Sequence, residues 1–481
     1  MVAGDRPGGV RTRGRHVSAT LLGQGAPVTR LLVTNAVLLT CDPDRPPAFR
    51  GWFTVGDDGR ITGVHEGDPG PEVTAERVLD VAGALVGPGF VSSHSHLFTS
   101  ASRGMAADQS LYGWIEGMTR YTEAADAEDV YWFTRHGAQD FLRNGITTAF
   151  DFTDPDLAFE RQSAGVASFV AALPDTAYQH AQLRASLDAG LRSVHSVMLG
   201  QGAVPQADAL AQLDDVVGMA AAFGDDPRFL RMAVSGAVQW APSPAAADLE
   251  LAAMRRHGLL NQPHLLETPH EVELQRSKFG WYRDAGVLGP DVVFGHFIQT
   301  DEAIIATSAE AGCGVSWQPM SNGRLASGVT SIPEIRAAGM RVGIGLDDQS
   351  CTDVSDPFSN MRTGIALLRA TYRDPAAMPV GDMLTLATRG SAEVLGVDDR
   401  VGSLRVGRFA DFLVVDPRDP DTGPVWDPVA TYVLACSLRN LHQVWSGGVQ
   451  VADGARLVDP QAGEVVSQTH ERMARLAAAV G

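Results

Sequence analysis

Between about residues 90 and 400 the sequence alternates short apolar runs with longer segments in which apolar residues recur at helical spacing. The runs include GITTAFDF, NQPHLLE, VVFGHF and RVGIGLDD, and one of the segments between them is DEAIIATSAEA. Strand-helix alternation over this length favours a (β/α) barrel over a β-sandwich. Because 481 residues is well beyond the usual size of one compact core, we expect an α/β protein with a large barrel and a smaller domain.

The segments on both sides of this region have a different pattern. They contain short β-branched runs, such as NAVLLTCD and ADFLVVDP, separated by Asp-Gly and Gly-rich turns. We expect residues 29–88 and 400–463 to form one composite β-sandwich domain from both chain ends, beside a distorted catalytic (β/α)8 TIM barrel of residues 89–399. Residues 464–481 predict a closing helix, and residues 1–28, rich in Gly, Arg and Ala, predict a mobile tail.

The balance of charges disfavours one class of partner. The chain has 38 Lys and Arg against 57 Asp and Glu, a formal charge of −19, whereas nucleic-acid binding depends on clustered cations. No stretch approaches the roughly 18 apolar residues that cross a bilayer, and the basic N-terminal segment lacks the apolar core of a signal peptide. The four cysteines form no CxxC pair, so a disulfide framework or a thiolate zinc site is not indicated. We expect a cytoplasmic protein that binds neither nucleic acid nor membrane.

Several of the apolar runs end in a residue type that binds metal ions. These residues are His94 and His96 in VSSHSH, His264 in NQPHLLE, His296 in VVFGH and Asp347 in RVGIGLD. Each one singly is as well explained as a buried, hydrogen-bonded polar group, but strand ends meet at the C-terminal mouth of a barrel. Glu267, three residues after His264, places an acid/base group nearby. Three neutral imidazoles and one carboxylate suit one divalent ion, Zn²⁺ or Fe²⁺, with an open position for water.

Further motifs follow these in one order along the chain: PGFVSSHSHLFTSASRG, NGITTAFDF, HLLETPHE, GHFIQTDEAI, QPMSNGRLASG and GIGLDD. With them the sequence resembles the amidohydrolase superfamily, in particular its branch of aromatic-ring deaminases and atrazine chlorohydrolase-type enzymes. The resemblance covers nearly all of residues 30 to 460. It implies the barrel and the composite sheet domain described above, and a site at the mouth of the barrel.

The resemblance also implies a role for each strand-end residue. The metal ligands would be His94, His96, His264 and Asp347. Glu267 would move protons between an activated water and the substrate, His296 would polarise the departing nitrogen or stabilise the oxyanion, and Asp347 would orient the attacking water. Binuclear relatives bridge two metals with a carboxylated lysine at a strand end. The single lysine, Lys278, lies in the helical stretch RSKFGW, which implies a mononuclear site.

Two positions depart from the pattern of the family. Thr99 stands where relatives usually have a glutamine that contacts the ring, and Asp348 follows Asp347 where glycine is usual. Asp348 is interpreted either as a loop cap or as a partner for an amino-bearing substrate. The candidate substrate-binding residues are Thr99, Arg103, Trp114, Trp240, Trp317, Asn322 and Asp348. The tryptophans could stack on a flat ring or simply pack, and Asn322 could bind substrate or serve a turn.

The function implied by the resemblance is that of a metal-dependent hydrolase that deaminates a heterocyclic or amidine-type small molecule. The main alternative keeps the site and changes the bond, to an amide, urea or cyclic amide, or to another exocyclic leaving group; the changes at Thr99 and Asp348 support it. A second alternative is a non-catalytic relative that uses the barrel for binding. Relatives commonly form dimers, so we expect a possible homodimer that acts on a small molecule.

Overall fold

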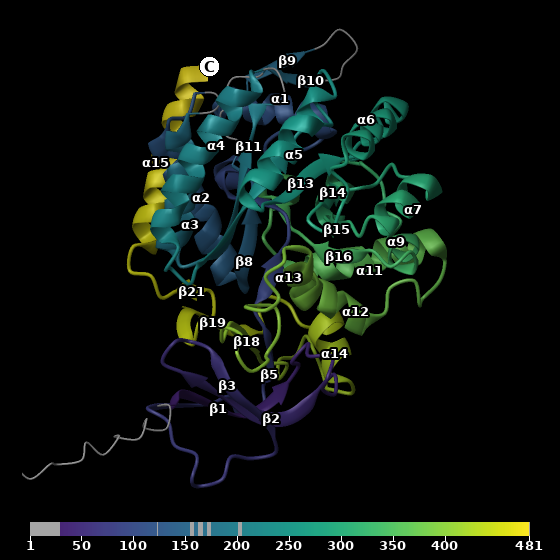
Figure 1. Ribbon diagram of the computed structural model, residues 1–481. Helices are drawn as coiled ribbons and strands as arrows, with labels where there is room; N and C mark the ends of the chain where they lie inside the picture. Colours follow the sequence, from purple (N-terminus) through teal and green to yellow (C-terminus); the bar gives the residue numbers. More distant parts are fainter. Residues whose placement is uncertain are drawn as a thin grey trace, which may run out of the picture.

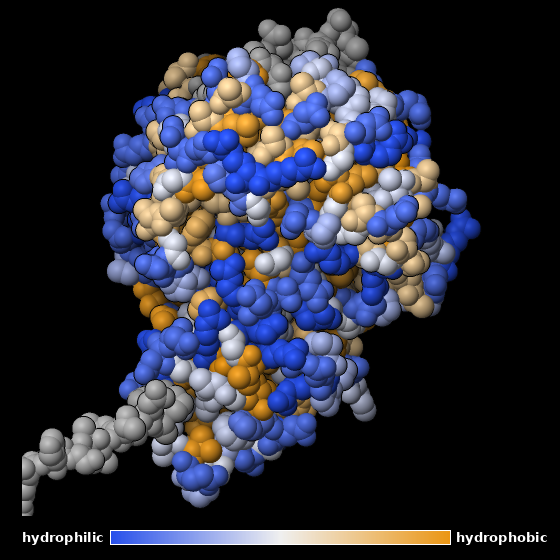
Figure 2. All heavy atoms as spheres, viewed as in Figure 1, coloured by the Kyte–Doolittle hydropathy of each residue, from blue (hydrophilic) through white to orange (hydrophobic). Residues whose placement is uncertain are grey.

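The structure is a computed structural model that describes residues 29–122, 124–153, 158–161, 167–170, 175–200 and 204–480. The expected tail of residues 1–28 lies outside the described residues. A barrel with helices around it makes up the larger part of the molecule, and a smaller sheet lies beyond one end of it (Figure 1). Hydrophilic and apolar residues are interspersed in small patches over the face shown in Figure 2.

Eight strands form the barrel, each parallel to its neighbours. In spatial order they are β6 (Phe90–Ser92), β8 (Ile146–Asp151), β11 (Arg192–Met198), β12 (Phe229–Gly236), β13 (Leu260–Leu265), β14 (Val293–His296), β15 (Gly314–Trp317) and β16 (Arg341–Ile344). The predicted α/β barrel is confirmed.

The barrel closes imperfectly between its first and last strands. The backbone N–H of Ser93 donates to the carbonyl of Ile344 at 3.2 Å. Just beyond, β7 (Ser95–His96) pairs in parallel with β17 (Asp347–Asp348). The predicted distortion of the barrel is at this seam, and the seam carries two of the strand-end motifs.

The helices lie around the barrel and at its ends (Figure 1). In chain order they are η1 (Leu97–Ser102), α1 (Leu111–Thr122), α2 (Ala127–Arg143), α3 (Thr176–Ala189), α4 (Gln206–Ala220), η3 (Ala221–Phe223), α5 (Ala245–His257), α6 (Val272–Ala285), α7 (Glu302–Glu310), α8 (Pro319–Arg324), α9 (Ile332–Ala337), α10 (Gln349–Thr352), α11 (Pro357–Tyr372), α12 (Val380–Thr385), the π-helical turn η4 (Leu386–Gly390), α13 (Ser391–Val394), α14 (Pro428–Ala430), the π-helical turn η5 (Thr431–Ala435) and α15 (Ala462–Val480). Within the described residues, none of them is both long enough and apolar enough to span a bilayer.

Local sequence explains where several of these helices begin and end. Asp126 and Asp129 form a reciprocal capping box at the start of α2. Asp301 and Asp356 accept backbone N–H groups at the starts of α7 and α11. Helix α3 ends at Gly190, whose φ of +93° is a conformation that glycine adopts without strain. The terminal helix α15 packs against α2, where Arg472 donates to Asp129 at 3.0 Å.

The smaller sheet is built from both ends of the chain. Its strands are β1 (Thr29–Leu38), β2 (Phe49–Gly56), β3 (Ile61–Glu66), β4 (Arg77–Asp80), β5 (Leu85–Pro88), β18 (Phe412–Val415), β19 (Leu441–Ser446), β20 (Val449–Asp453) and β21 (Arg456–Leu457). The two ends join where β5 pairs antiparallel with β18. Phe412 packs between Phe53 and Trp445, with ring centroids 5.1 and 5.3 Å away. A separate hairpin pairs β9 (Ala158–Arg161) with β10 (Ala167–Val170).

A buried ion pair connects the smaller sheet to the barrel. Arg192 of β11 donates two hydrogen bonds to Asp411, at 2.7 and 3.0 Å, and its guanidinium lies over the ring of Phe409. Asp411 also accepts the backbone N–H of Gly447. Both charged side chains are only 3% exposed, so this contact is part of the core.

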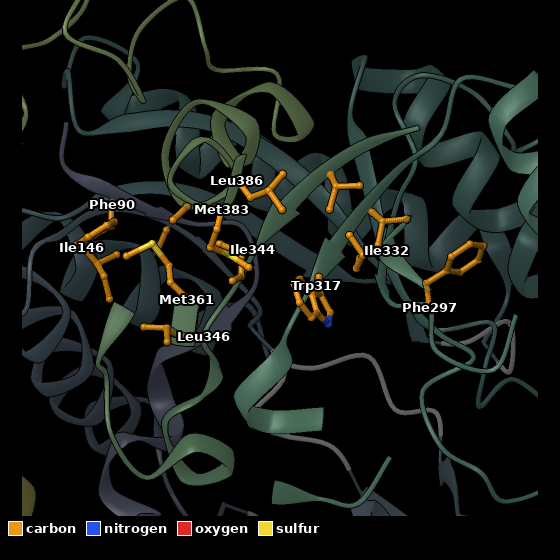
Figure 3. Close-up of a cluster of buried hydrophobic side chains, with 14 of the residues drawn as sticks. Phe90, Ile146, Phe297, Trp317, Ile332, Ile344, Leu346, Met361, Met383 and Leu386 are labelled. Atoms are coloured by element: carbon orange, nitrogen blue, oxygen red, sulfur yellow. The ribbon is translucent and has the colours of Figure 1, made fainter. Parts of the chain in front are cut away.

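The main apolar core fills the space between the barrel strands and the helices outside them (Figure 3). Trp317 of β15 is 1% exposed and lies in this core with Ile344 and Met383. A Cβ at Gly364 of α11 would lie 2.8 Å from the Trp317 ring, so a glycine lets helix and ring approach.

Candidate metal centre and active site

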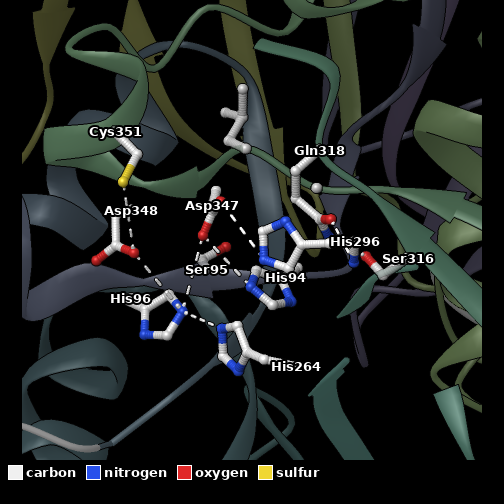
Figure 4. Close-up of polar contacts among 12 residues, drawn as sticks. His94, Ser95, His96, His264, His296, Ser316, Gln318, Asp347, Asp348 and Cys351 are labelled. Carbon is white, nitrogen blue, oxygen red and sulfur yellow. Dashed lines mark hydrogen bonds and ion pairs between the residues drawn. The ribbon is translucent and has the colours of Figure 1, made fainter. Parts of the chain in front are cut away.

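The side chains of His94, His96, His264 and Asp347 meet at the C-terminal mouth of the barrel (Figure 4). The Nε2 atoms of His96 and His264 are 3.1 Å apart. Asp347 Oδ1 lies 3.3 Å from His94 Nε2 and 3.8 Å from His96 Nε2. One ligand atom from each of the three histidines falls within 4.8 Å of the other two. The structure thus brings together the four residues that the sequence singled out as metal ligands.

A hydrogen-bond chain fixes the orientation of the His94 ring. His94 Nδ1 lies 2.6 Å from Gln262 Oε1, and Gln262 Nε2 donates to the carbonyl of Ser93 at 2.9 Å. Because that amide nitrogen already donates to the backbone, its oxygen accepts the Nδ1 proton, and His94 Nε2 is left as a lone pair that faces the cluster. His94 Nε2 is buried and has no hydrogen-bond partner among the described residues.

The role of Gln262 was not predicted from the sequence. Gln262 lies two residues before His264 on β13, and residues two apart on a strand share a face. That spacing could have indicated that Gln262 lies on the same side of the strand as His264.

Glycines and one aromatic ring make room for the imidazoles. A Cβ at Gly295 would lie 2.9 Å from His94 Cε1, and a Cβ at Gly345 would lie 2.7 Å from His94 Cβ. Phe152, directly after β8, contacts three imidazoles, with its ring centroid 4.6 Å from that of His94 and 4.5 Å from those of His96 and His264. The Phe152 ring therefore covers one side of the cluster and excludes water from that side.

The electrostatics of the cluster fit a cation. Burial and the neighbouring imidazoles lower the pKa of His96 and of His264 well below the usual value, so both rings are neutral. Burial alone would raise the pKa of Asp347, but His296 and His94 outweigh it and hold that pKa well below its usual range. Neutral nitrogens 3.1 Å apart beside an ionised carboxylate make a site that a divalent ion would complete. Asp347 also has a φ of +67°, a strained conformation of the kind that clusters at functional sites.

Glu267 and His296 lie beside the cluster. His296 Nε2 is 3.6 Å from Glu267 Oε1 and 3.8 Å from Asp347 Oδ2, while His296 Nδ1 is 2.9 Å from Asn322 Oδ1. Burial raises the pKa of Glu267 to about 7, with a smaller lowering contribution from His296 and a raising one from Asp347. A carboxyl group with this pKa can both take up and release a proton near neutrality.

Asp348 faces the same space as Asp347. Burial and the charge of Asp347 raise the pKa of Asp348 well above its usual value. Asp348 Oδ2 lies 3.8 Å from His96 Nε2 and accepts a weak contact from Cys351 Sγ at 3.9 Å, while Oδ1 has no hydrogen-bond partner among the described residues. Its side chain makes no capping hydrogen bond to α10. The position therefore does not match the loop-cap interpretation.

A cavity lies above the cluster. Its polar floor consists of His96, His264, Glu267, Asp347 and Asp348. Its apolar roof consists of Phe98, Leu111, Trp114, Ile115, Met118, Met198 and Trp240. Trp114 and Trp240 thus line the cavity as expected. The other roof residues were missed, although Leu111, Ile115 and Met118 have helical spacing in the sequence.

Four candidate substrate-binding residues lie elsewhere. The Trp317 ring is enclosed in the main core, and Arg103 extends to Asp140 at 2.6 Å. Thr99 donates to the carbonyl of His96 and accepts from the backbone N–H of Gln349, so its hydroxyl holds two loops together. None of them is among the residues that line the cavity.

The fourth, Asn322, lies within α8, and its Oδ1 is 2.9 Å from His296 Nδ1. It therefore acts on the site through His296, and it too is absent from the cavity lining.

A distorted parallel barrel with three imidazoles and a carboxylate at its C-terminal mouth defines a class of hydrolases that use a bound metal to act on carbon-nitrogen bonds. The model of the Amidohydrolase family matches residues 85–451, and the chain belongs to this family. The predicted family and enzyme class are therefore confirmed.

Two relatives illustrate the similarity in sequence. The 5-methylthioadenosine/S-adenosylhomocysteine deaminase of Syntrophobacter fumaroxidans is 30% identical over 446 residues, covering 91% of this chain and 96% of that protein. The 5'-deoxyadenosine deaminase of Methanosarcina mazei is 28% identical over 414 residues, covering 82% of this chain and 87% of that protein.

Two solved structures show the same fold. An adenosine deaminase of Xanthomonas campestris with bound zinc has a TM-score of 0.81 at 22% identity, covering 94% of this chain and 100% of that one. The atrazine chlorohydrolase of Arthrobacter aurescens in complex with zinc has a TM-score of 0.79 at 20% identity, covering 92% of this chain and 100% of that one.

Proposed function

We propose that this enzyme hydrolytically removes an amino group from an sp² carbon of a nitrogen heterocycle, with aminopurines as the first class to test. The observation that carries the proposal is the position of Glu267. Its carboxyl has a pKa raised to about 7 and lies 3.6 Å from His296 at the edge of the histidine cluster. The names of the two relatives compared by sequence, both deaminases of adenosine-type compounds, support the choice of ring.

The proposed ligands of one divalent ion are His94, His96, His264 and Asp347. Zinc is the first candidate because similar structures hold it, and Fe²⁺ suits the same donors. When bound, the ion supplies Lewis acidity that lowers the pKa of water toward neutrality. A single ion is favoured because Lys278 Nζ donates to the carbonyls of Gln239 and Ala241, away from the cluster.

The protein's own groups account for the movement of protons. Ionised Asp347 accepts a hydrogen bond from the attacking water and orients it. Glu267 takes one proton from the water as the new carbon-oxygen bond forms. It then delivers that proton to the amino nitrogen as the carbon-nitrogen bond breaks, which releases ammonia. The second proton of the water moves from the new hydroxyl to the adjacent ring nitrogen, which leaves the ring carbonyl. His296, held by Asn322 through Nδ1, presents Nε2 toward the same space to stabilise charge on the adduct.

We further propose that Asp348 binds the amino group or an adjacent ring nitrogen. Two observations support this role: its Oδ1 has no hydrogen-bond partner within the described ranges of the chain, and its side chain is part of the polar floor. The cavity is mostly apolar with a few convergent polar groups, as small-molecule sites usually are, so the proposed substrate is a small molecule.

Ammonia release from a panel of aminated heterocycles tests the reaction, beside mass spectrometry that detects loss of any other leaving group. We expect ammonia from at least one aminopurine, and Glu267→Gln to lower kcat by about 10²- to 10⁴-fold while the metal content stays at one ion per chain. His264→Ala and exhaustive chelation should both abolish turnover, with recovery of the chelated enzyme on adding zinc. Full activity of Glu267→Gln would contradict the proposed proton transfer. Turnover without ammonia would favour another leaving group.

A further inference from the structure

The two sides of the cavity have different chemistry. The polar floor carries every carboxyl and imidazole group among the described residues that line the cavity. The apolar roof comes from η1, from α1, from the end of β11 and from the segment that follows β12, and its side chains are between 3% and 8% exposed. The reacting end of a substrate therefore meets carboxylates and imidazoles, and its far end meets carbon and sulfur.

Helix α1 supplies most of the roof from one of its faces. Leu111, Trp114, Ile115 and Met118 follow one another at intervals of three, one and three residues, which places them on one side of a helix. They belong with Leu325 and Cys351 to a small cluster that is separate from the main core, and Arg120 on another side of the helix is exposed. The apolar face of α1 thus points at the cavity.

The roof has few groups that could bind hydroxyls. The indole of Trp240 already hydrogen-bonds Tyr112. The indole N–H of Trp114 is a donor without a partner in the described part of the chain, and Thr122 also belongs to the lining. A sugar would bring several hydroxyl groups to the apolar roof, and each hydroxyl left without a hydrogen-bond partner would weaken binding.

We propose that the substrate carries an apolar group, alkyl, thioalkyl or aryl, on the side of the ring away from the amino group, and that the face of α1 formed by Leu111, Trp114, Ile115 and Met118 selects it. This inference rests on the proposed deamination, because the polar floor is taken to hold the amino-bearing edge of the ring. A hydroxylated sugar fits the apolar roof less well.

Adenines with different groups on the nitrogen that carries the sugar in adenosine test this inference. Propyl, butyl and pentyl groups form an apolar series, and dihydroxypropyl is the hydroxylated match to propyl. With the zinc-loaded enzyme we expect kcat/KM for ammonia release to rise about fourfold per added methylene. The dihydroxypropyl compound should react about tenfold or more slowly than the propyl compound. A flat series, or a preference for the hydroxylated compound or adenosine, would overturn the inference and leave deamination intact.

Variants on α1 locate the selectivity. Met118→Gln keeps the side-chain length and adds polarity, so it should remove most of the increase in kcat/KM from the propyl to the pentyl compound. Leu111→Asn, on the same face, should have the same effect and replaces Met118→Gln in the test if that variant folds poorly. Arg120→Gln, on the exposed side, should leave the gain unchanged. Equal gains in all variants would refute the assignment to this face.

Binding separates the inference from the proposed function. Calorimetric titration of zinc-loaded Glu267→Gln with the same compounds measures Kd without turnover. Affinities that rise along the apolar series would support the roof as an apolar site. If in addition no compound released ammonia, only the proposed deamination would be contradicted. Affinities that do not change along the series would overturn the inference whatever the reaction.

Discussion

At the scale of single residues, the candidate metal centre depends on side chains that never reach the cavity. Gln262 accepts the His94 Nδ1 proton, and its amide is itself fixed by the Ser93 carbonyl. Asn322 plays the same part for His296. Neutral amides in these positions set the ring tautomers without adding negative charge to a site that already holds an ionised Asp347.

Replacing Gln262 tests this orientation. In Gln262→Leu the His94 ring loses its acceptor, so we expect zinc affinity to fall about 10- to 100-fold, measured by competition with a chromophoric chelator. Gln450→Leu, the same change on β20 of the smaller sheet, is the matched control and should bind zinc as the unaltered protein does. Equal affinities for the two variants would show that the hydrogen bond does not hold the ring.

The sequence predicted the strand-end residues but not what surrounds them. His94, His264, His296 and Asp347 were recognisable because each follows an apolar run, and a parallel barrel brings such positions to one mouth. Their roles remain proposals. Residues in loops were not predictable in this way, because a loop has no periodicity that fixes where a side chain points. Arg103 was therefore placed near the substrate, whereas it pairs with Asp140.

At the scale of elements, the seam of the barrel depends on a close approach between two strands. Gly345, directly after β16, has its Cα against the backbone of His94, and an added Cβ would lie 2.8 Å from the His94 carbonyl oxygen. A side chain there must move the strand that carries the first histidine motif.

We therefore expect Gly345→Ala to lower the free energy of unfolding by about 1–3 kcal/mol and to weaken zinc binding, measured by urea denaturation and chelator competition. Gly381→Ala in α12 is the control, because a Cβ there would meet nothing within 4 Å. A Gly345→Ala protein as stable as the control would mean that the seam opens at little cost.

A buried carboxyl connects three other elements and makes stability depend on pH. Glu250 of α5 accepts hydrogen bonds from the Ala237 backbone, from Asn261 of β13 and from Tyr282 of α6. Burial nevertheless raises its pKa from 4.5 to about 7. Between these two values the folded chain holds a proton that the unfolded chain releases, so the stability contributed by this group is present below pH 4.5 and is lost as the pH rises to about 7.

Replacing this carboxyl with an amide removes the titration. We expect the difference in unfolding free energy between the unaltered protein and Glu250→Gln to change by about 3 kcal/mol between pH 4.5 and 7, in favour of the variant at the higher pH. Urea denaturation at several pH values measures it. Parallel pH profiles for the two proteins would show that Glu250 has an ordinary pKa.

Element by element, the sequence predicted the barrel well and the roof of the cavity poorly. Runs such as VVFGHF and RVGIGLDD correspond to β14 and β16, because a strand buried on both faces leaves a continuous apolar run. The apolar face of α1 has a periodicity that equally fits a helix packed on a core. Only the three-dimensional arrangement shows that this face borders a cavity.

At the scale of the whole molecule, the barrel and the smaller sheet share the buried pair of Arg192 and Asp411. Asp411→Asn leaves the Arg192 charge without its counterion in the core, and we expect a loss of about 3–5 kcal/mol of stability. Asp284→Asn, which removes the partner of exposed Arg283, should leave the thermal midpoint nearly unchanged. If Asp411→Asn behaved like this control, the pair would not hold the two parts together.

The junction of β5 with β18 determines when this protein can finish folding. Phe412 and Pro88 are paired neighbours in space but are separated by the entire barrel along the chain. A ribosome must therefore release more than three hundred further residues before the strand made early finds its neighbour, and until then the guanidinium of Arg192 has no carboxylate to meet. Incomplete translation products would display an open sheet edge, which marks them for aggregation or for recognition by chaperones and proteases.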